Sequence, residues 1–111
     1  DFTHPDRVEL DVLDRVENFV NNAIKIGGEV GIEMMLKSVA ENDKTIEASI
    51  WDRYPDEVKV YTMKGNDGTV FSRELCGGPH VERLEKIQGT FKITKEESSS
   101  AGIRRIKAIL V

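Results

Sequence analysis

One long amphipathic segment near the start of the chain constrains the fold more than any other feature. The stretch "THPDRVEL" indicates a helix start, because Thr3 or His4 can cap the helix and Pro5 suits its first turn. Glycines at 27 and 28 indicate where the helix ends. Apolar residues recur at helical spacing along one side, opposite charged and amide residues. That apolar side comprises Leu13, Val16, Val20, Ala23 and Ile24, with Phe19 beside them.

After this helix, the sequence is dominated by short segments that are typical of strands. The clearest is 57–63, where Val58 and Val60 alternate with Lys59 and Tyr61. The stretch "KGNDG" that follows predicts a hairpin turn. Strands are expected at 29–34, 57–63, 69–75, 90–96 and 103–111, a short helix at 35–42, a turn at 52–57, an irregular segment or helical turn at 81–89 and a polar loop at 97–102. Residues 45–51 fit a strand or a helix equally well.

Together these elements predict an α+β fold in two layers. One long amphipathic helix and short helices would pack on a mostly antiparallel sheet, with the apolar last strand in a central position. A chain of 111 residues has enough length for one modest core, so we expect a single domain over residues 1–111. The chain opens with Asp1 and no Met, which indicates a fragment of a longer protein.

The composition excludes some classes of function. A net charge of -4 argues against binding nucleic acid by bulk electrostatics, so any such contact needs a local basic patch. No apolar run reaches the roughly 18 residues of a membrane span, and we expect no membrane partner. A single cysteine cannot form an internal disulfide, which favours the reducing cytoplasm.

That cysteine lies in "SRELCGGPHV" at 72–81, where Cys76 and His80 are separated by two glycines and a proline. Spacing alone leaves three interpretations open: a buried core cysteine, a nucleophile with its base, or half of a zinc site. The glycines would let the loop fold tightly enough for both side chains to converge. The sequence offers at most one further thiolate or imidazole ligand, His4, so a complete site would need a carboxylate, a water or a residue from elsewhere.

Four motifs in order change the balance between these interpretations. They are "DFTHP" at 1–5, "DEVKVYTM" at 56–63, "CGGPH" at 76–80 and "SAGIRRI" at 100–106. Together they resemble the editing domain of alanyl-tRNA synthetases, a module also found in threonyl-tRNA synthetases and in free-standing alanyl-tRNA editing proteins. The resemblance runs over nearly the whole chain.

This resemblance implies hydrolysis of tRNA(Ala) that has been mischarged with serine or glycine, which an alanine pocket excludes poorly by size. It implies that Cys76 and His80 are zinc ligands and that Gly77 and Gly78 shape the loop for the aminoacyl end. The expected partners are the acceptor end of tRNA(Ala) and the remainder of the synthetase chain. Arg104 and Arg105 match the paired arginines of the family's closing motif and are candidates for substrate binding, although strand-edge salt bridges would explain them equally well.

Two departures from the family pattern set further expectations. The family's His-x-x-x-His, which supplies two zinc ligands, has no counterpart here, and residues 83–89 differ from the family's usual loop. We therefore expect half a zinc site and a fragment that is inactive alone. The alternatives are a non-catalytic module that docks tRNA or self-associates through an open face, a threonyl-type editing domain, and a zinc-binding domain unrelated to tRNA.

Overall fold

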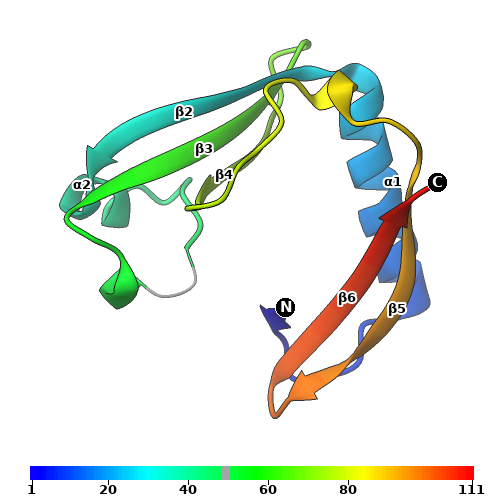
Figure 1. The fold of residues 1–111 in the computed structure, drawn as a ribbon. Coiled ribbons are helices and arrows are strands. Elements are labelled where there is room, and N and C mark those ends of the chain that lie inside the picture. Colours follow the sequence, from blue (N-terminus) through cyan, green and yellow to red (C-terminus); the bar gives the residue numbers. More distant parts are fainter. Residues whose placement is uncertain (49–50) are drawn as a thin grey trace. The chain divides into compact units, whose positions relative to one another are not determined.

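The computed structural model describes residues 1–48 and 51–111, and it confirms the α+β class. These residues form one long helix, a short α-helix and two antiparallel three-stranded sheets (Figure 1). It divides into two compact units, the first comprising residues 1–22 and 88–111 and the second residues 23–87. In the described part of the chain, no helix has the length and apolar character needed to cross a membrane.

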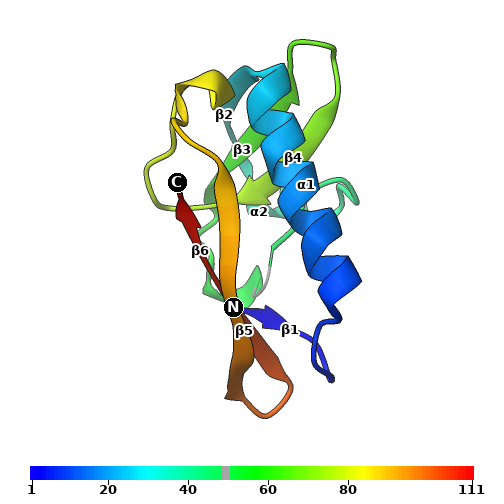
Figure 2. The same ribbon diagram turned by 90° about the vertical axis from the view of Figure 1, so that its right-hand side faces the viewer.

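The first unit contains a sheet with the strand order β1-β6-β5. Its strands are β1 (Phe2–Thr3), β5 (Phe91–Ser100) and β6 (Ile103–Leu110), and the last two form the long orange and red hairpin of Figures 1 and 2. The predicted central position of the last strand is confirmed. The unit also contains most of helix α1 (Leu10–Ile26), whose side chains bind the outer edge of β5. Asn21 exchanges two hydrogen bonds with the backbone of Phe91, and Glu17 accepts one from the N–H of Ile93.

Two predicted boundaries in this unit were wrong. Helix α1 begins at Leu10 rather than near Pro5, because the preceding residues are held by the sheet. Thr3 pairs with Ile103, and the N–H of Val8 donates to Glu96 across the unit instead of entering a helical turn. The polar segment 97–100 is part of β5, since its residues pair with β6, and only the turn at 101–102 separates the two strands.

The second unit is built on the sheet β2-β3-β4. Its strands are β2 (Gly28–Leu36), β3 (Glu57–Gly65) and β4 (Val70–Leu75), accompanied by α2 (Lys37–Glu41) and the short helices η1 (Trp51–Arg53) and η2 (Leu84–Lys86). These positions confirm the predicted strands, the hairpin turn at 64–68 and the short helix before Asn42. Its buried core consists of Ala40, Ile46, Val58, Val60 and Leu75. Within the ambiguous segment 45–51, Ile46 joins this core, and residues 49 and 50 lie outside the described part of the chain.

The junction between α1 and β2 requires glycine. Gly27 has a φ of 73°, and its N–H bonds the Ala23 carbonyl at 3.0 Å, which is a common way for a helix to end. Gly28 has a φ of 150°, and a Cβ at this position would lie 2.1 Å from the carbonyl oxygen of Lys64. The pair therefore ends the helix and lets β2 start directly against β3.

Candidate functional site

The loop Cys76–His80 leaves the end of β4 and folds over the middle of β3. Val60 of β3 pairs with Leu75 of β4, and both belong to the core. Because side chains alternate along a strand, Tyr61 lies on the opposite face, as the sequence pattern predicted. Tyr61 is nevertheless only 7% exposed. The loop explains this burial, since His80 stacks on the Tyr61 ring with centroids 3.8 Å apart and an interplanar angle of 22°.

One backbone carbonyl holds the loop together. The oxygen of Gly78 accepts a hydrogen bond from the Tyr61 hydroxyl at 3.0 Å and lies 3.2 Å from Nδ1 of His80. A carbonyl can only accept, and its two lone pairs accommodate two donors. The contact with His80 is a hydrogen bond when Nδ1 carries a proton, and in the Nδ1–H tautomer the free lone pair is on Nε2.

Cys76 is accessible rather than sealed in the core. Its side chain is half-buried, and its Sγ accepts a hydrogen bond from the N–H of Gly78 at 3.4 Å. Cys76 and Gly77 lie at one side of a mostly apolar surface hollow of about 260 Å³, which Met34 and Tyr54 also line. The interpretation of Cys76 as a residue that fills the core is therefore wrong, and the thiol and the imidazole follow one another on a single exposed loop.

The glycines of the loop are not required by its backbone conformation. Neither Gly77 nor Gly78 has a positive φ, so the turn itself does not require glycine. A Cβ at Gly78 would lie 3.7 Å from the sulfur of Cys76, which is ordinary contact, and a Cβ at Gly77 would meet nothing within 4 Å. The absence of a side chain at Gly77 leaves the loop surface open next to Cys76.

The donor set fits half of a zinc site. A thiolate and an imidazole are typical zinc ligands, and a structural site usually has four ligands. In residues 1–48 and 51–111, no group of three or more His, Cys, Asp or Glu side chains could hold a metal ion. His4 makes local contacts at the start of the chain, where its Nδ1 lies 2.8 Å from the carbonyl of Asp6 and its ring meets that of Phe2 edge-on.

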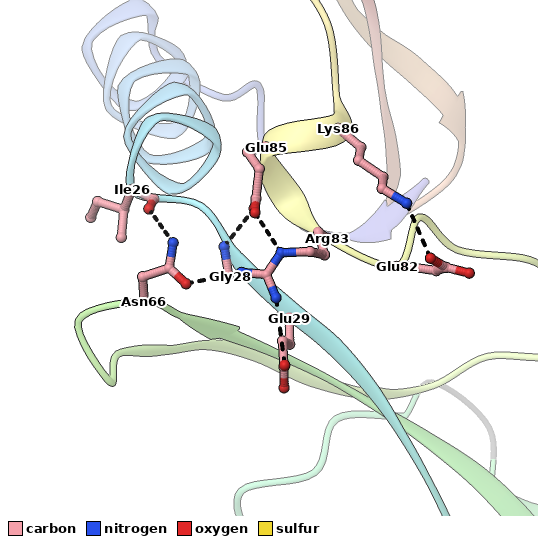
Figure 3. Close-up of polar contacts among 8 residues, drawn as sticks. All are labelled: Ile26, Gly28, Glu29, Asn66, Glu82, Arg83, Glu85 and Lys86. Carbon is pink, nitrogen blue, oxygen red and sulfur yellow. Dashed lines mark hydrogen bonds and ion pairs between the residues drawn. The ribbon is translucent and has the colours of Figure 1, made fainter.

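The segment that follows His80 is fastened to the start of β2. The N–H of Val30 donates to the carbonyl of Glu82 at 2.9 Å, and Arg83 forms an isolated bridge with Glu29. Figure 3 shows Glu85 between the backbone of Gly28, whose N–H it accepts at 2.9 Å, and the guanidinium of Arg83. These contacts anchor the far end of the loop, while β4 anchors its near end.

The polar cluster of Figure 3 also changes an ionisation. Arg83 and then the N–H of Gly28 lower the pKa of Glu85 from 4.5 to about 2. The guanidinium of Arg83 also donates a hydrogen bond to the side-chain oxygen of Asn66. The amide nitrogen of Asn66 in turn donates to the carbonyl of Ile26 at the end of α1. Sequence reasoning missed this cluster, although Arg83 and Glu85 fall in the segment 83–89 that departs from the family pattern.

The two candidate arginines form ion pairs within the first unit. Arg104 binds Glu96, which also accepts the N–H of Val8, and these contacts lower the pKa of Glu96, with Arg104 as the main cause. Arg105 binds Asp1 through two hydrogen bonds of 2.7 and 2.9 Å. The salt bridges considered from the sequence are therefore present, and contact of either arginine with substrate stays a prediction.

The paired strands and the loop lie in a stretch of the chain that matches a known family. Residues 58–107 match the family model described as threonyl and alanyl tRNA synthetase second additional domain. The chain belongs to this family of synthetase domains.

Comparison with individual proteins points to the alanyl members. The chain is 43% identical over 112 residues to the alanine–tRNA ligase of Borreliella burgdorferi, covering 100% of the chain and 18% of that protein. It is 44% identical over 110 residues to the alanine–tRNA ligase of Treponema pallidum, covering 99% and 17%. The corresponding enzyme of Endomicrobium trichonymphae is 42% identical over 110 residues, covering 98% and 12%. The family resemblance predicted from the motifs is confirmed, and the chain spans less than a fifth of the length of these relatives.

Proposed function

We propose that this chain forms part of an editing site that hydrolyses the ester bond of tRNA(Ala) mischarged with serine or glycine. Two findings support the proposal: the chain belongs to the synthetase domain family, and the relatives it matches over nearly its whole length carry the name alanine–tRNA ligase. Serine and glycine differ from alanine by so little that one binding pocket separates them poorly, so a second, hydrolytic site is needed.

The arrangement of His80 is the observation that carries this proposal. Ligating histidines commonly donate the second ring N–H to a backbone carbonyl, which fixes the ring and the tautomer. Nδ1 of His80 lies within hydrogen-bond distance of the carbonyl oxygen of Gly78, and Cys76 lies on the same exposed loop. A zinc ion bound by Cys76 and His80 would act there as a Lewis acid that positions the tRNA terminus or the attacking water.

The other residues of the loop take supporting roles. The open surface at Gly77 would let the aminoacyl end approach, and the neighbouring hollow gives the approaching end an apolar wall. Arg104 and Arg105 are successive residues of β6 and point to opposite faces of the strand, so one of the two would contact the tRNA backbone. The proposed partners are the acceptor end of tRNA(Ala) and the remainder of the synthetase chain, in the cytoplasm.

Deacylation of mischarged tRNA tests the proposal. The substrates are Ser-tRNA(Ala) and Gly-tRNA(Ala), with Ser-tRNA(Thr) to separate an alanyl from a threonyl specificity. We expect no turnover by the 111-residue chain alone, and turnover by an alanine–tRNA ligase that contains it. In that ligase Cys76→Ala and His80→Ala should each abolish deacylation and lower the zinc content. Undiminished deacylation by both variants would contradict the proposal.

A row of apolar side chains on β2 favours an additional role in assembly. Ile32, Met34 and Leu36 are 61%, 50% and 57% exposed and share one face of this edge strand. We propose that this face packs against the remainder of the synthetase, and that in isolation it lets two chains associate. Met34→Lys should then shift the isolated chain toward the monomer in light scattering. Val39→Lys, on the equally exposed Val39 of α2, is the control, and equal effects of the two substitutions would contradict a specific interface.

A further inference from the structure

Tyr61 is buried on the side of β3 where the strand pattern places exposed residues. Its neighbours on the same face are Lys59 of β3, which is exposed, and the cross-strand partner Ile32, which is 61% exposed. Tyr61 itself is 7% exposed and does not belong to the buried core cluster of this unit. Its contacts are with the loop, so the burial of Tyr61 depends on the position of the loop.

Tyr61 holds the loop through two kinds of contact. Its hydroxyl donates to the carbonyl of Gly78, and its ring lies under the imidazole of His80 at 3.8 Å. The hydroxyl fixes the same oxygen that Nδ1 of His80 uses, so it orients the acceptor that selects the tautomer. The ring limits tilting of the imidazole out of its plane, since a stacked arrangement is kept only while the two planes stay nearly parallel.

We propose that Tyr61 is a positioning residue that holds His80 as the Nδ1–H tautomer, with Nε2 unprotonated and directed away from the loop backbone. This inference rests on the proposed function in one respect: an unprotonated Nε2 matters because it is the atom that a zinc ion would bind. The tautomer of His80 depends only on residues of this chain, so it can be measured without metal and without tRNA.

The experiment is nitrogen NMR of the two histidine rings in the metal-free 111-residue chain. At about pH 8, above the ordinary histidine pKa of about 6.5, the long-range proton–nitrogen pattern distinguishes a protonated Nδ1 from a protonated Nε2. The chain has two histidines, so His4 serves as an internal reference. The stacked phenol ring should also shift the carbon-bound protons of the His80 imidazole upfield.

Three variants separate positioning from mere filling of space. Tyr61→Leu removes the ring and the hydroxyl, and we expect loss of the upfield shift and a majority of the Nε2–H form. Tyr61→Phe keeps the ring, so the upfield shift should persist while the Nδ1–H fraction falls to an intermediate value. Phe91→Leu in β5 is the matched control, which should change the thermal midpoint without changing the His80 signals.

An unchanged Nδ1–H fraction in both Tyr61 variants would overturn the inference, and so would an unchanged fraction in folded Tyr61→Phe if Tyr61→Leu fails to fold. Titration with Zn²⁺ adds an independent measure, because the loss of the tautomer should weaken binding at least tenfold in Tyr61→Leu. If Cys76→Ala and His80→Ala leave deacylation by the ligase undiminished and the tautomer in the isolated chain still depends on Tyr61, the proposed function fails while the positioning role stands.

Discussion

The backbone N–H of Gly28 donates to the carboxylate of Glu85 at 2.9 Å, which joins the first residue of β2 to the segment after His80. The same carboxylate binds the guanidinium of Arg83 (Figure 3). A single side chain thus links the β2 start to the anchor of the candidate loop. Its ionisation should be visible in the stability of the fold.

Glu85→Gln should make the free energy of unfolding less dependent on pH in the acidic range. The pKa of Glu85 is lowered to about 2 in the folded chain, so its carboxylate stabilises the fold above the ordinary value of 4.5, and this contribution is lost as the pH falls toward 2. Urea unfolding should show Glu85→Gln less stable at neutral pH, with a difference that narrows between about pH 5 and about pH 2. A constant difference over that range would contradict the assignment. Glu82→Gln, whose partner is Lys86 on the surface, is the control.

Gly28→Ala should destabilise the chain much more than Gly31→Ala in the same strand. A Cβ at Gly28 would lie 2.1 Å from a backbone oxygen, whereas at Gly31 the nearest atom is 4.0 Å away. We expect a loss of about 2 kcal/mol or more at Gly28, because its backbone conformation is also strained for alanine. At Gly31 the change should be within about 1 kcal/mol and of either sign. Similar unfolding midpoints for the two variants would show that β2 does not start as described.

Arg104→Gln should cost more stability than Arg105→Gln. The side chains of Arg104 and Glu96 are 17% and 4% exposed, while those of Arg105 and Asp1 are 43% and 45% exposed. Removing Arg104 leaves a shielded carboxylate without its main partner, and exposed pairs contribute little. Chemical denaturation measures the difference. If Arg105 instead proves the more important for stability, the ion pair of Arg104 is not the one that holds this sheet.

Gly77→Ala should leave the fold intact and impair the proposed deacylation. The position has no positive φ and no atom within 4 Å of the added Cβ, so the thermal midpoint should stay within experimental error. In an alanine–tRNA ligase carrying this domain, the methyl group would narrow the approach to Cys76, and kcat/KM for Ser-tRNA(Ala) should fall about tenfold, or about 1.4 kcal/mol. Gly31→Ala is the control. Full activity of Gly77→Ala would show that substrate does not pass this point.

Local patterns predicted the elements whose signals are local. The alternation of Val58 and Val60 with Lys59 and Tyr61, followed by a glycine-rich turn, was sufficient for the β3–β4 hairpin. The end of α1 followed from two glycines. The start of α1 could not be predicted in the same way, because Thr3 pairs with Ile103 of β6 and Val8 binds Glu96, and these partners lie 100 and 88 residues further along the chain.

The candidate site shows the same division. The motif predicted that Cys76 and His80 lie on one loop, and the structure places both residues on the loop that follows β4. It could not predict that Tyr61, which looks like an exposed strand residue, is covered by that loop. Nor could it predict the link from Glu85 to Gly28, since charged residues in an irregular segment carry no signal for their partners.

The binding of β5 by helix α1 has a consequence for how copies of this chain can meet. An uncovered strand at the border of a sheet is a template on which another chain can add a strand and begin to aggregate. At Phe91 and Ile93 the N–H groups are already taken by Asn21 and Glu17, so an incoming strand finds no donors there. Helix α1 thus blocks the addition of another strand at this edge of the sheet.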